Sequence, residues 1–123
     1  MRLNEIHYND AKPVEGYGPG YFRIGGTVHE APLAVLPSGV TGWGGYEDRE
    51  TLLAAAGEVD VILVGTGAEI AHIPRALREA LEAAGVGLEV MASPAACRTF
   101  NVLLSEGRRV GLALLPVALP DEK

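Results

Sequence analysis

The sequence is poor in cysteine and in basic residues. Its 123 residues include one cysteine, Cys97, which has no partner for an internal disulfide and cannot by itself complete a cysteine zinc site. We therefore expect a reducing compartment, the cytoplasm. Ten lysines and arginines face sixteen acidic residues, for a formal net charge of -6. This balance argues against a nucleic-acid partner, because binding to phosphates requires clustered basic side chains.

A long apolar run is also missing. The longest, residues 110–119, is interrupted by Pro116 and has about half of the ~20 residues that a membrane-spanning helix needs. The N-terminal residues, MRLNEIHYNDAKP, lack the apolar segment of a secretory signal and the arginine- and serine-rich composition of a transit peptide. These observations predict a protein that neither spans a membrane nor carries an export signal.

Hydrophobic residues make up 48% of the chain, which at this length suffices for one core but not for two domains. We expect a single α/β domain with a mixed sheet. Residues 1–45 are predicted to form a β-rich segment, and residues 59–116 a βαβαβ unit.

The β-rich segment is marked by glycines and aromatic residues. Short runs at 21–24, 27–29, 33–36 and 40–43 are bounded by glycine or proline and predict strands of a small antiparallel sheet or meander. These strands could extend the sheet of the βαβαβ unit or fold over its other face. Trp43 lies among glycines, and a lone tryptophan is more often part of a core than a contact with a partner, although both roles stay open.

The second half alternates between strands and helices. Runs at 59–64, 88–91 and 110–115 are rich in aliphatic residues and predict strands. The run at 59–64 is almost wholly apolar, which is typical of a strand covered on both faces. Helical spacing of apolar residues predicts helices over 74–85 and 94–105. Right-handed crossovers would make the three strands parallel neighbours, with both helices on the same face unless the strand order reverses.

Local signals define the helix ends. Ser93 is expected to cap the helix at 94–105 by accepting a hydrogen bond from a free backbone amide, and Pro94 suits the first helical position. Gly107 allows the positive φ that ends this helix. Asp48 is expected to cap an earlier, shorter helix.

The sequence Gly65-Thr66-Gly67 follows a strand and precedes a helix, which is the position of a dinucleotide-binding fingerprint. The third glycine of that fingerprint would fall at Ile70, so the fingerprint is absent. No phosphate-binding loop sequence occurs either. The favoured interpretation is a tight turn that needs glycine for its dihedral angles.

Cys97 lies near the start of a predicted helix, where the helix dipole would favour a thiolate. A nucleophile also needs a base, and no spacing singles out His7, His29 or His72 for that role. A buried, inert cysteine beside Phe100 is therefore favoured. The histidines also lack the spacing of metal ligands, so we predict no metal site, no cofactor and no catalytic residue.

Arg98, Asn101 and Ser105 recur on one side of the helix at 94–105. Such a polar line is often only solvated. The start of this helix and the loop at 65–67 both follow parallel strands, however, and α/β sheets tend to form clefts at that edge. Backbone amides there, together with Arg98, could hold an anion.

Three stretches resemble a known family: residues 96–110 (ACRTFNVLLSEGRRV), 17–24 (YGPGYFRI) and 63–67 (LVGTG). They are similar to the Mth938-like family of small domains, which includes mitochondrial complex I assembly factor 3 and an adipogenesis-associated domain protein. The resemblance covers nearly the whole chain and implies a three-layer α/β domain without established catalytic activity. For the mitochondrial member it implies an accessory role in building respiratory complex I, and the lack of a transit peptide favours a bacterial relative.

Two functions of different classes follow. The first is a non-enzymatic accessory or binding protein, in which patches around Arg98, Asn101 and the Trp43 loop contact a protein partner, such as a subunit of a membrane complex. The alternative is a small-molecule or anion-binding protein, or an enzyme, that uses a cleft at the carboxyl ends of the strands. The residues expected to form that cleft are Thr66, Gly67, Ser93, Arg98 and Asn101.

Overall fold

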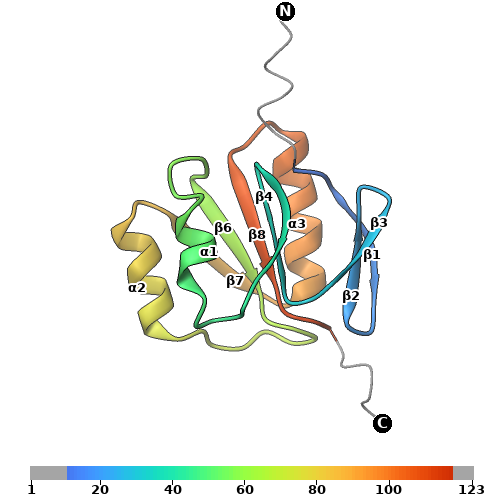
Figure 1. Cartoon of the computed structure of the whole chain (residues 1–123), viewed down its shortest axis with the longest axis horizontal. Coiled ribbons are helices and arrows are strands. Elements are labelled where there is room, and N and C mark those ends of the chain that lie inside the picture. Colours follow the sequence, from blue (N-terminus) through green and yellow to red (C-terminus); the bar gives the residue numbers. More distant parts are fainter. Residues whose placement is uncertain (1–10, 118–123) are drawn as a thin grey trace, which may run out of the picture.

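A computed structural model describes residues 11–117 and places a five-stranded sheet at the centre of the molecule (Figure 1). In order across the sheet, the strands are β5 (Gly39–Gly42), β4 (Leu33–Leu36), β8 (Val110–Leu114), β6 (Val61–Gly65) and β7 (Gly87–Met91). A separate antiparallel meander consists of β1 (Val14–Gly18), β2 (Tyr21–Ile24) and β3 (Thr27–Glu30). The helices are α1 (Arg49–Leu53), α2 (Arg75–Ala83) and α3 (Ser93–Ser105).

The central strand β6 pairs in parallel with both β7 and β8, which confirms the predicted parallel arrangement. The chain passes from β6 outward to β7 and then back across β6 to β8, so the strand order reverses. Because both crossovers have the same hand, this reversal puts α2 and α3 on opposite faces of the sheet. The result is the predicted three-layer α/β fold.

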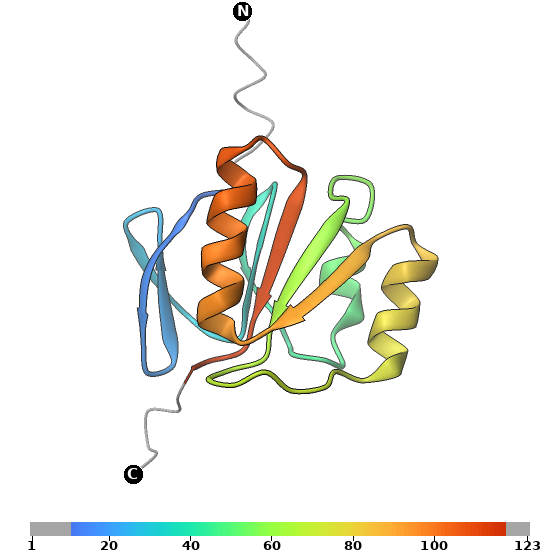
Figure 2. The same ribbon diagram turned by 180° about the vertical axis from the view of Figure 1, so that it is seen from behind.

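Side chains of β6 point alternately to the two faces. Ile62 packs with Leu77 of α2 and with α1, in the core on what we call the α2 face. Leu63 packs with Phe100 of α3, in the core on the α3 face. Figure 2 shows α3 lying across its face of the sheet, with the meander beside it. The sheet is therefore covered on both sides, as its nearly continuous apolar strands predict.

In the β-rich segment, some strands extend the main sheet and the others pack on one of its faces. The β4–β5 hairpin extends the main sheet, because β4 pairs with β8 in antiparallel fashion. The meander packs on the α3 face through the buried side chains of Val14, Phe22 and Ile24. Residues 1–10 of the predicted segment lie outside the described part of the chain.

The helix ends mostly follow their local signals. The carboxylate of Asp48 accepts a hydrogen bond from the Thr51 amide and caps α1, as predicted. Gly85 after α2 and Gly107 after α3 have φ values of 89° and 78°. No helix within residues 11–117 combines the length and the apolar character that crossing a bilayer requires.

Candidate functional site

Of the five residues predicted to form a cleft at the strand ends, Thr66, Gly67 and Ser93 lie together at a hydrogen-bonded junction, whereas Arg98 and Asn101 lie elsewhere on α3. Ser93 is fully buried, and its hydroxyl accepts a hydrogen bond from the Gly67 amide at 2.9 Å and donates one to the Leu115 carbonyl at 2.8 Å. The Ser93 amide donates to the Gly67 carbonyl at 2.8 Å. These bonds join the loop after β6, the start of α3 and the end of β8, so this hydroxyl serves the fold.

This use of the hydroxyl corrects the predicted helix cap. The N-cap of α3 is Ala92, no side chain caps the helix, and Ser93 and Pro94 are its first two residues. The predicted cap was wrong because the sequence cannot distinguish a local bond from a bond to a distant loop. Both would use the same serine oxygen.

Thr66 organises the loop that leaves β6. Its hydroxyl donates to the Glu69 carbonyl at 2.7 Å and accepts from the Ala71 amide at 3.1 Å. Its own amide donates to the Met91 carbonyl at the end of β7, at 2.9 Å. The side chain of Thr66 thus sets the path of residues 69–71.

The predicted polar line on α3 divides into two environments. Arg98 is exposed on the outer face of α3, and Val102, one turn further, leaves 54% of its surface exposed. Asn101 faces the meander instead. Its amide nitrogen donates to the Val14 carbonyl, its oxygen accepts from the Val14 amide, and both distances are 2.9 Å. Asn101 therefore ties β1 to α3.

Replacing Asn101 by alanine is expected to lower the free energy of unfolding by about 1–3 kcal/mol, because both backbone groups of the buried Val14 lose their partner. Urea denaturation measures the loss, and hydrogen exchange should show faster exchange in β1 and β2 than in β6. Arg98→Ala, three residues earlier and exposed, is the matched control and should stay within about 0.5 kcal/mol of the wild type. Equal effects of the two substitutions would contradict this role of Asn101.

Trp43 belongs to the core, with 4% of its surface exposed. Its indole nitrogen donates to the Asp48 carbonyl at 3.0 Å, and its ring meets Tyr46 edge-on, with the ring centres 6.1 Å apart. The Asp48 carboxylate accepts hydrogen bonds from the Thr51 hydroxyl and from the Gly44 and Thr51 amides, which lower its pKa. The interpretation of Trp43 as a core residue is confirmed, so its side chain does not form a contact surface.

Cys97 lies in the core of the α3 face with 5% of its surface exposed. Burial raises the pKa of its thiol to about 12, although the charge of the adjacent Arg98 acts in the opposite direction. Desolvation of the thiolate therefore outweighs the charge of Arg98. The structure supports the buried, inert cysteine.

Cys97 is expected to react with a thiol reagent at pH 8 at least ~100-fold more slowly in the folded protein than in urea, because only the accessible thiolate reacts.

The same thiol should make stability depend on pH. Since folding raises the pKa of Cys97 from 9.0 to about 12, the protonated thiol is favoured in the native state. Stability from this group is complete below pH 9 and is lost as the pH rises towards 12. Burial also raises the pKa of Tyr46. The Cys97 contribution is therefore measured as the difference between the wild type and Cys97→Ala, and parallel stability curves from pH 8 to 12 would contradict it.

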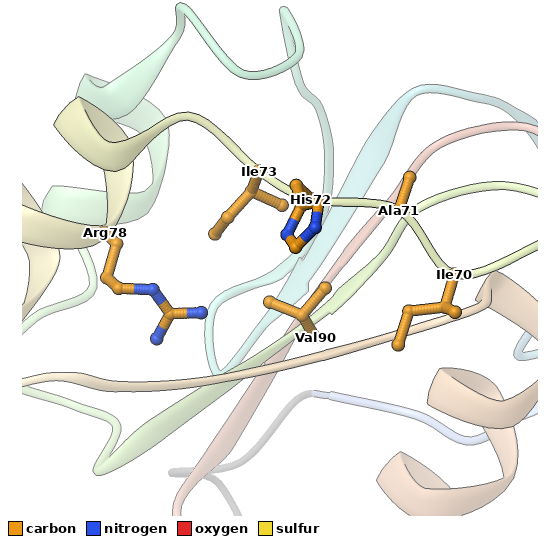
Figure 3. Close-up of a pocket in the computed structure, with 6 residues that line it drawn as sticks. All are labelled: Ile70, Ala71, His72, Ile73, Arg78 and Val90. Atoms are coloured by element: carbon orange, nitrogen blue, oxygen red, sulfur yellow. The ribbon is translucent and has the colours of Figure 1, made fainter.

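A pocket on the α2 face was not predicted. It has a volume of about 360 Å³ and lies between the 66–74 loop, the start of α2 and the edge strand β7 (Figure 3). Its lining residues are Ile70, Ala71, His72, Ile73, Arg78 and Val90. In Figure 3 the side chains of His72, Ile73, Arg78 and Val90 surround one space. The pocket thus combines an apolar lining with one permanent positive charge.

One sequence signal for this pocket existed. Ile70 and Ile73 lie between a strand and a helix, and apolar residues mark a binding surface where they form a contiguous exposed patch. Ile70 leaves 65% of its surface exposed. Within the described part of the chain, no three histidine, cysteine or carboxylate side chains gather as a possible metal site.

The fold and these surfaces define a small three-layer α/β domain. The hydroxyls of Thr66 and Ser93, at the ends of its strands, form hydrogen bonds within the domain itself. The chain belongs to the family of proteins of unknown function DUF498/DUF598, which matches residues 14–115.

Relatives of known sequence or structure agree with this assignment. The chain is 50% identical over 117 residues to an uncharacterised protein of Rhodobacter capsulatus, a match that covers 95% of this chain and 94% of that protein. It is 32% identical over 110 residues to NADH dehydrogenase (ubiquinone) 1 alpha subcomplex assembly factor 3 of Danio rerio, covering 84% of this chain and 63% of the assembly factor. The solution structure of a Mth938-like domain from Bordetella pertussis matches with a TM-score of 0.72 and 31% identity, covering 97% and 94% of the two chains. The resemblance to the Mth938-like family is confirmed, and the chain spans less than two thirds of the assembly factor's length.

Proposed function

We propose that this chain is a non-enzymatic accessory protein that binds a subunit of a membrane complex while that complex is being assembled. The observation that carries the proposal is the similarity, across most of this chain, to proteins named as assembly factors for NADH dehydrogenase. The proposal places the chain in the cytoplasm, the compartment predicted from its single cysteine.

The outer face of α3 is the surface that we assign to this partner. Arg98 and Val102 lie one turn apart on it and are exposed, while Phe100 on the inner face is fully buried. The helix is held on the sheet by Leu63 and on the meander by Asn101, so the two exposed side chains stand on a rigid support. Arginine is enriched at protein interfaces, and the exposed Val102 adds apolar surface next to it.

The test is to delete the gene in its host and to measure assembled NADH dehydrogenase on native gels and by NADH oxidation in membranes. The wild-type gene should restore both. Arg98→Glu and Val102→Glu should restore them only weakly, because each places a negative charge in the contact. Ile70→Glu makes the same kind of change at an exposed residue of the 66–74 loop, outside α3, and should restore them fully.

A photo-crosslinking residue at position 102 identifies the partner directly. We expect it to label a subunit of the membrane complex, whereas the same residue at position 70 should not. Normal assembly of NADH dehydrogenase in the deletion strain would overturn the proposal. Full restoration by Val102→Glu, with assembly lost in the deletion strain, would overturn the assignment of the α3 face alone.

A further inference from the structure

We infer that the pocket between β7, α2 and the 66–74 loop binds the carboxylate of a small apolar acid. In this binding mode the Arg78 guanidinium receives the carboxylate, and Ile70, Ile73 and Val90 enclose the aliphatic part of the ligand. The site lies on the α2 face, away from Arg98 and Val102. The inference therefore does not depend on the assembly role.

The charges around the pocket favour an anion. Arg78 is the permanent cation among the described lining residues, and none of these is acidic. Its guanidinium meets Glu82 through a single contact of 3.4 Å, and its side chain keeps 40% of its surface exposed. Such a long, exposed pair is weak, and a guanidinium has five N–H donors, so Arg78 retains donors for a ligand carboxylate.

The strand β7 keeps its own acidic residue away from this pocket. Leu88 packs in the core on the α2 face and Met91 on the α3 face. Because side chains alternate along a strand, Val90 lies on the α2 face with Leu88, and Glu89 lies on the opposite face with Met91. The strand β7 therefore contributes the aliphatic Val90, and not Glu89, to the pocket lining.

The loop that forms the rim is held in place before any ligand binds. The Thr66 hydroxyl bonds to the Glu69 carbonyl and to the Ala71 amide, which fixes the backbone on either side of Ile70. The exposed Ile70 is thus held beside the pocket in a loop with a defined path. A preorganised rim lowers the entropy cost of binding.

The volume limits the size of the ligand. At about 360 Å³ the pocket lies at the lower end of the range of roughly 300–1,000 Å³ seen for small-molecule sites. A short aliphatic acid is small enough for this volume. Its carboxylate suits Arg78, and its chain suits the apolar lining residues. The same chemistry occurs at the C-terminal carboxylate of a peptide that ends in leucine, and the experiment separates these two sources.

The test is a titration of the ¹⁵N-labelled protein with butyrate, hexanoate and octanoate, followed by amide chemical shifts. We expect shifts at Ala71, His72 and Arg78, with affinity rising about two- to four-fold per CH₂ until the pocket is full. Hexanamide, which has the same chain without the charge, should bind at least about ten-fold more weakly than hexanoate. A peptide ending in Val-Leu is titrated with a free C-terminal carboxylate and with a C-terminal amide. If the peptide with the free carboxylate binds more tightly than hexanoate, the natural ligand is the C-terminus of a chain.

Variants of α2 separate the roles of its two charges. Arg78→Gln should lower the affinity for hexanoate at least about ten-fold, since the charge-assisted hydrogen bonds to the carboxylate are lost. Glu82→Gln should leave binding intact or strengthen it about two-fold, because it removes the competing carboxylate. Both positions are partly exposed, so both variants should fold, and thermal melts verify this.

Ile70→Glu is a second, independent variant at the pocket rim. Its added negative charge should repel the acid and lower the affinity at least about five-fold. Val102→Glu, an equally charged change at an exposed residue of the α3 face, should leave the affinity within about two-fold. The inference is overturned if no acid, including the peptide, binds at about 10 mM, or if Arg78→Gln and Ile70→Glu leave binding unchanged. Equal binding of hexanoate and hexanamide would overturn the role of the carboxylate.

Discussion

Replacing Gly65 by alanine is expected to lower the free energy of unfolding by about 3 kcal/mol, the upper part of the usual range for overpacking a core. A Cβ atom at this position would lie 2.8 Å from the backbone Cα of Ser93 and 2.8 Å from the buried Leu114 side chain. A backbone atom cannot move aside as a flexible side-chain end can. Alanine would therefore force α3 away from the end of β6. Urea denaturation measures the effect.

Gly57→Ala is the matched control for this substitution. A Cβ atom at Gly57 would meet nothing within 4 Å, and the residue is exposed. We expect a change within about 0.5 kcal/mol. If Gly65→Ala were tolerated as well as Gly57→Ala, the close approach of α3 to the end of β6 would be contradicted.

Ser93→Ala is expected to lower the free energy of unfolding by about 2–3 kcal/mol. The substitution leaves the buried Gly67 amide and the partly buried Leu115 carbonyl without the Ser93 hydroxyl that pairs with both. An unpaired buried polar group costs about 1–3 kcal/mol. Chemical denaturation gives the size of the loss, and hydrogen exchange at Gly67 should accelerate.

Ser105→Ala tests whether this loss is specific to the junction. Ser105 lies at the exposed end of the same helix, and its hydroxyl bonds only locally, to the Val102 carbonyl at 2.7 Å. We expect an effect within about 0.5 kcal/mol. A loss at Ser93 no larger than at Ser105 would show that the junction does not stabilise the fold.

The junction also relates the two proposed surfaces to each other. Ser93 begins the helix that carries Arg98 and Val102, and it bonds to the loop that continues through Thr66 to the rim of the pocket. Weakening the junction is therefore expected to disturb both surfaces together. This is why the tests of each surface use exposed residues such as Ile70 and Val102, whose substitution leaves the junction intact.

Much of the fold could be predicted from local patterns. The aliphatic run of β6 predicts a strand covered on both faces, and the periodic apolar residues of α2 and α3 predict helices between parallel strands. The glycines after both helices and the Asp48 cap act within a few residues of their own position. Signals of this kind need no knowledge of the rest of the chain.

The candidate site could be predicted only in part. Thr66, Gly67 and Ser93 do meet, but their polar groups bond to one another and to nearby backbone rather than facing a cleft. Asn101 bonds to Val14, which is 87 residues away in the sequence. A polar side chain looks the same in the sequence whether its partner is water, a ligand or a distant backbone group.

The sequence by itself determined most of the order of strands and helices, the apolar core and the family, because these depend on local periodicity and on specific motifs. It did not predict β1 (Val14–Gly18), whose glycines are typical of a turn. The tertiary structure decided which face each helix covers, through the reversal of strand order at β6, and it decided where the polar groups bond. It also formed the pocket, by bringing Arg78 of α2 and Val90 of β7 to the same loop. The physical reason is that local propensity does not specify which distant strand or backbone group a residue pairs with. Only the folded chain brings one of these partners into contact.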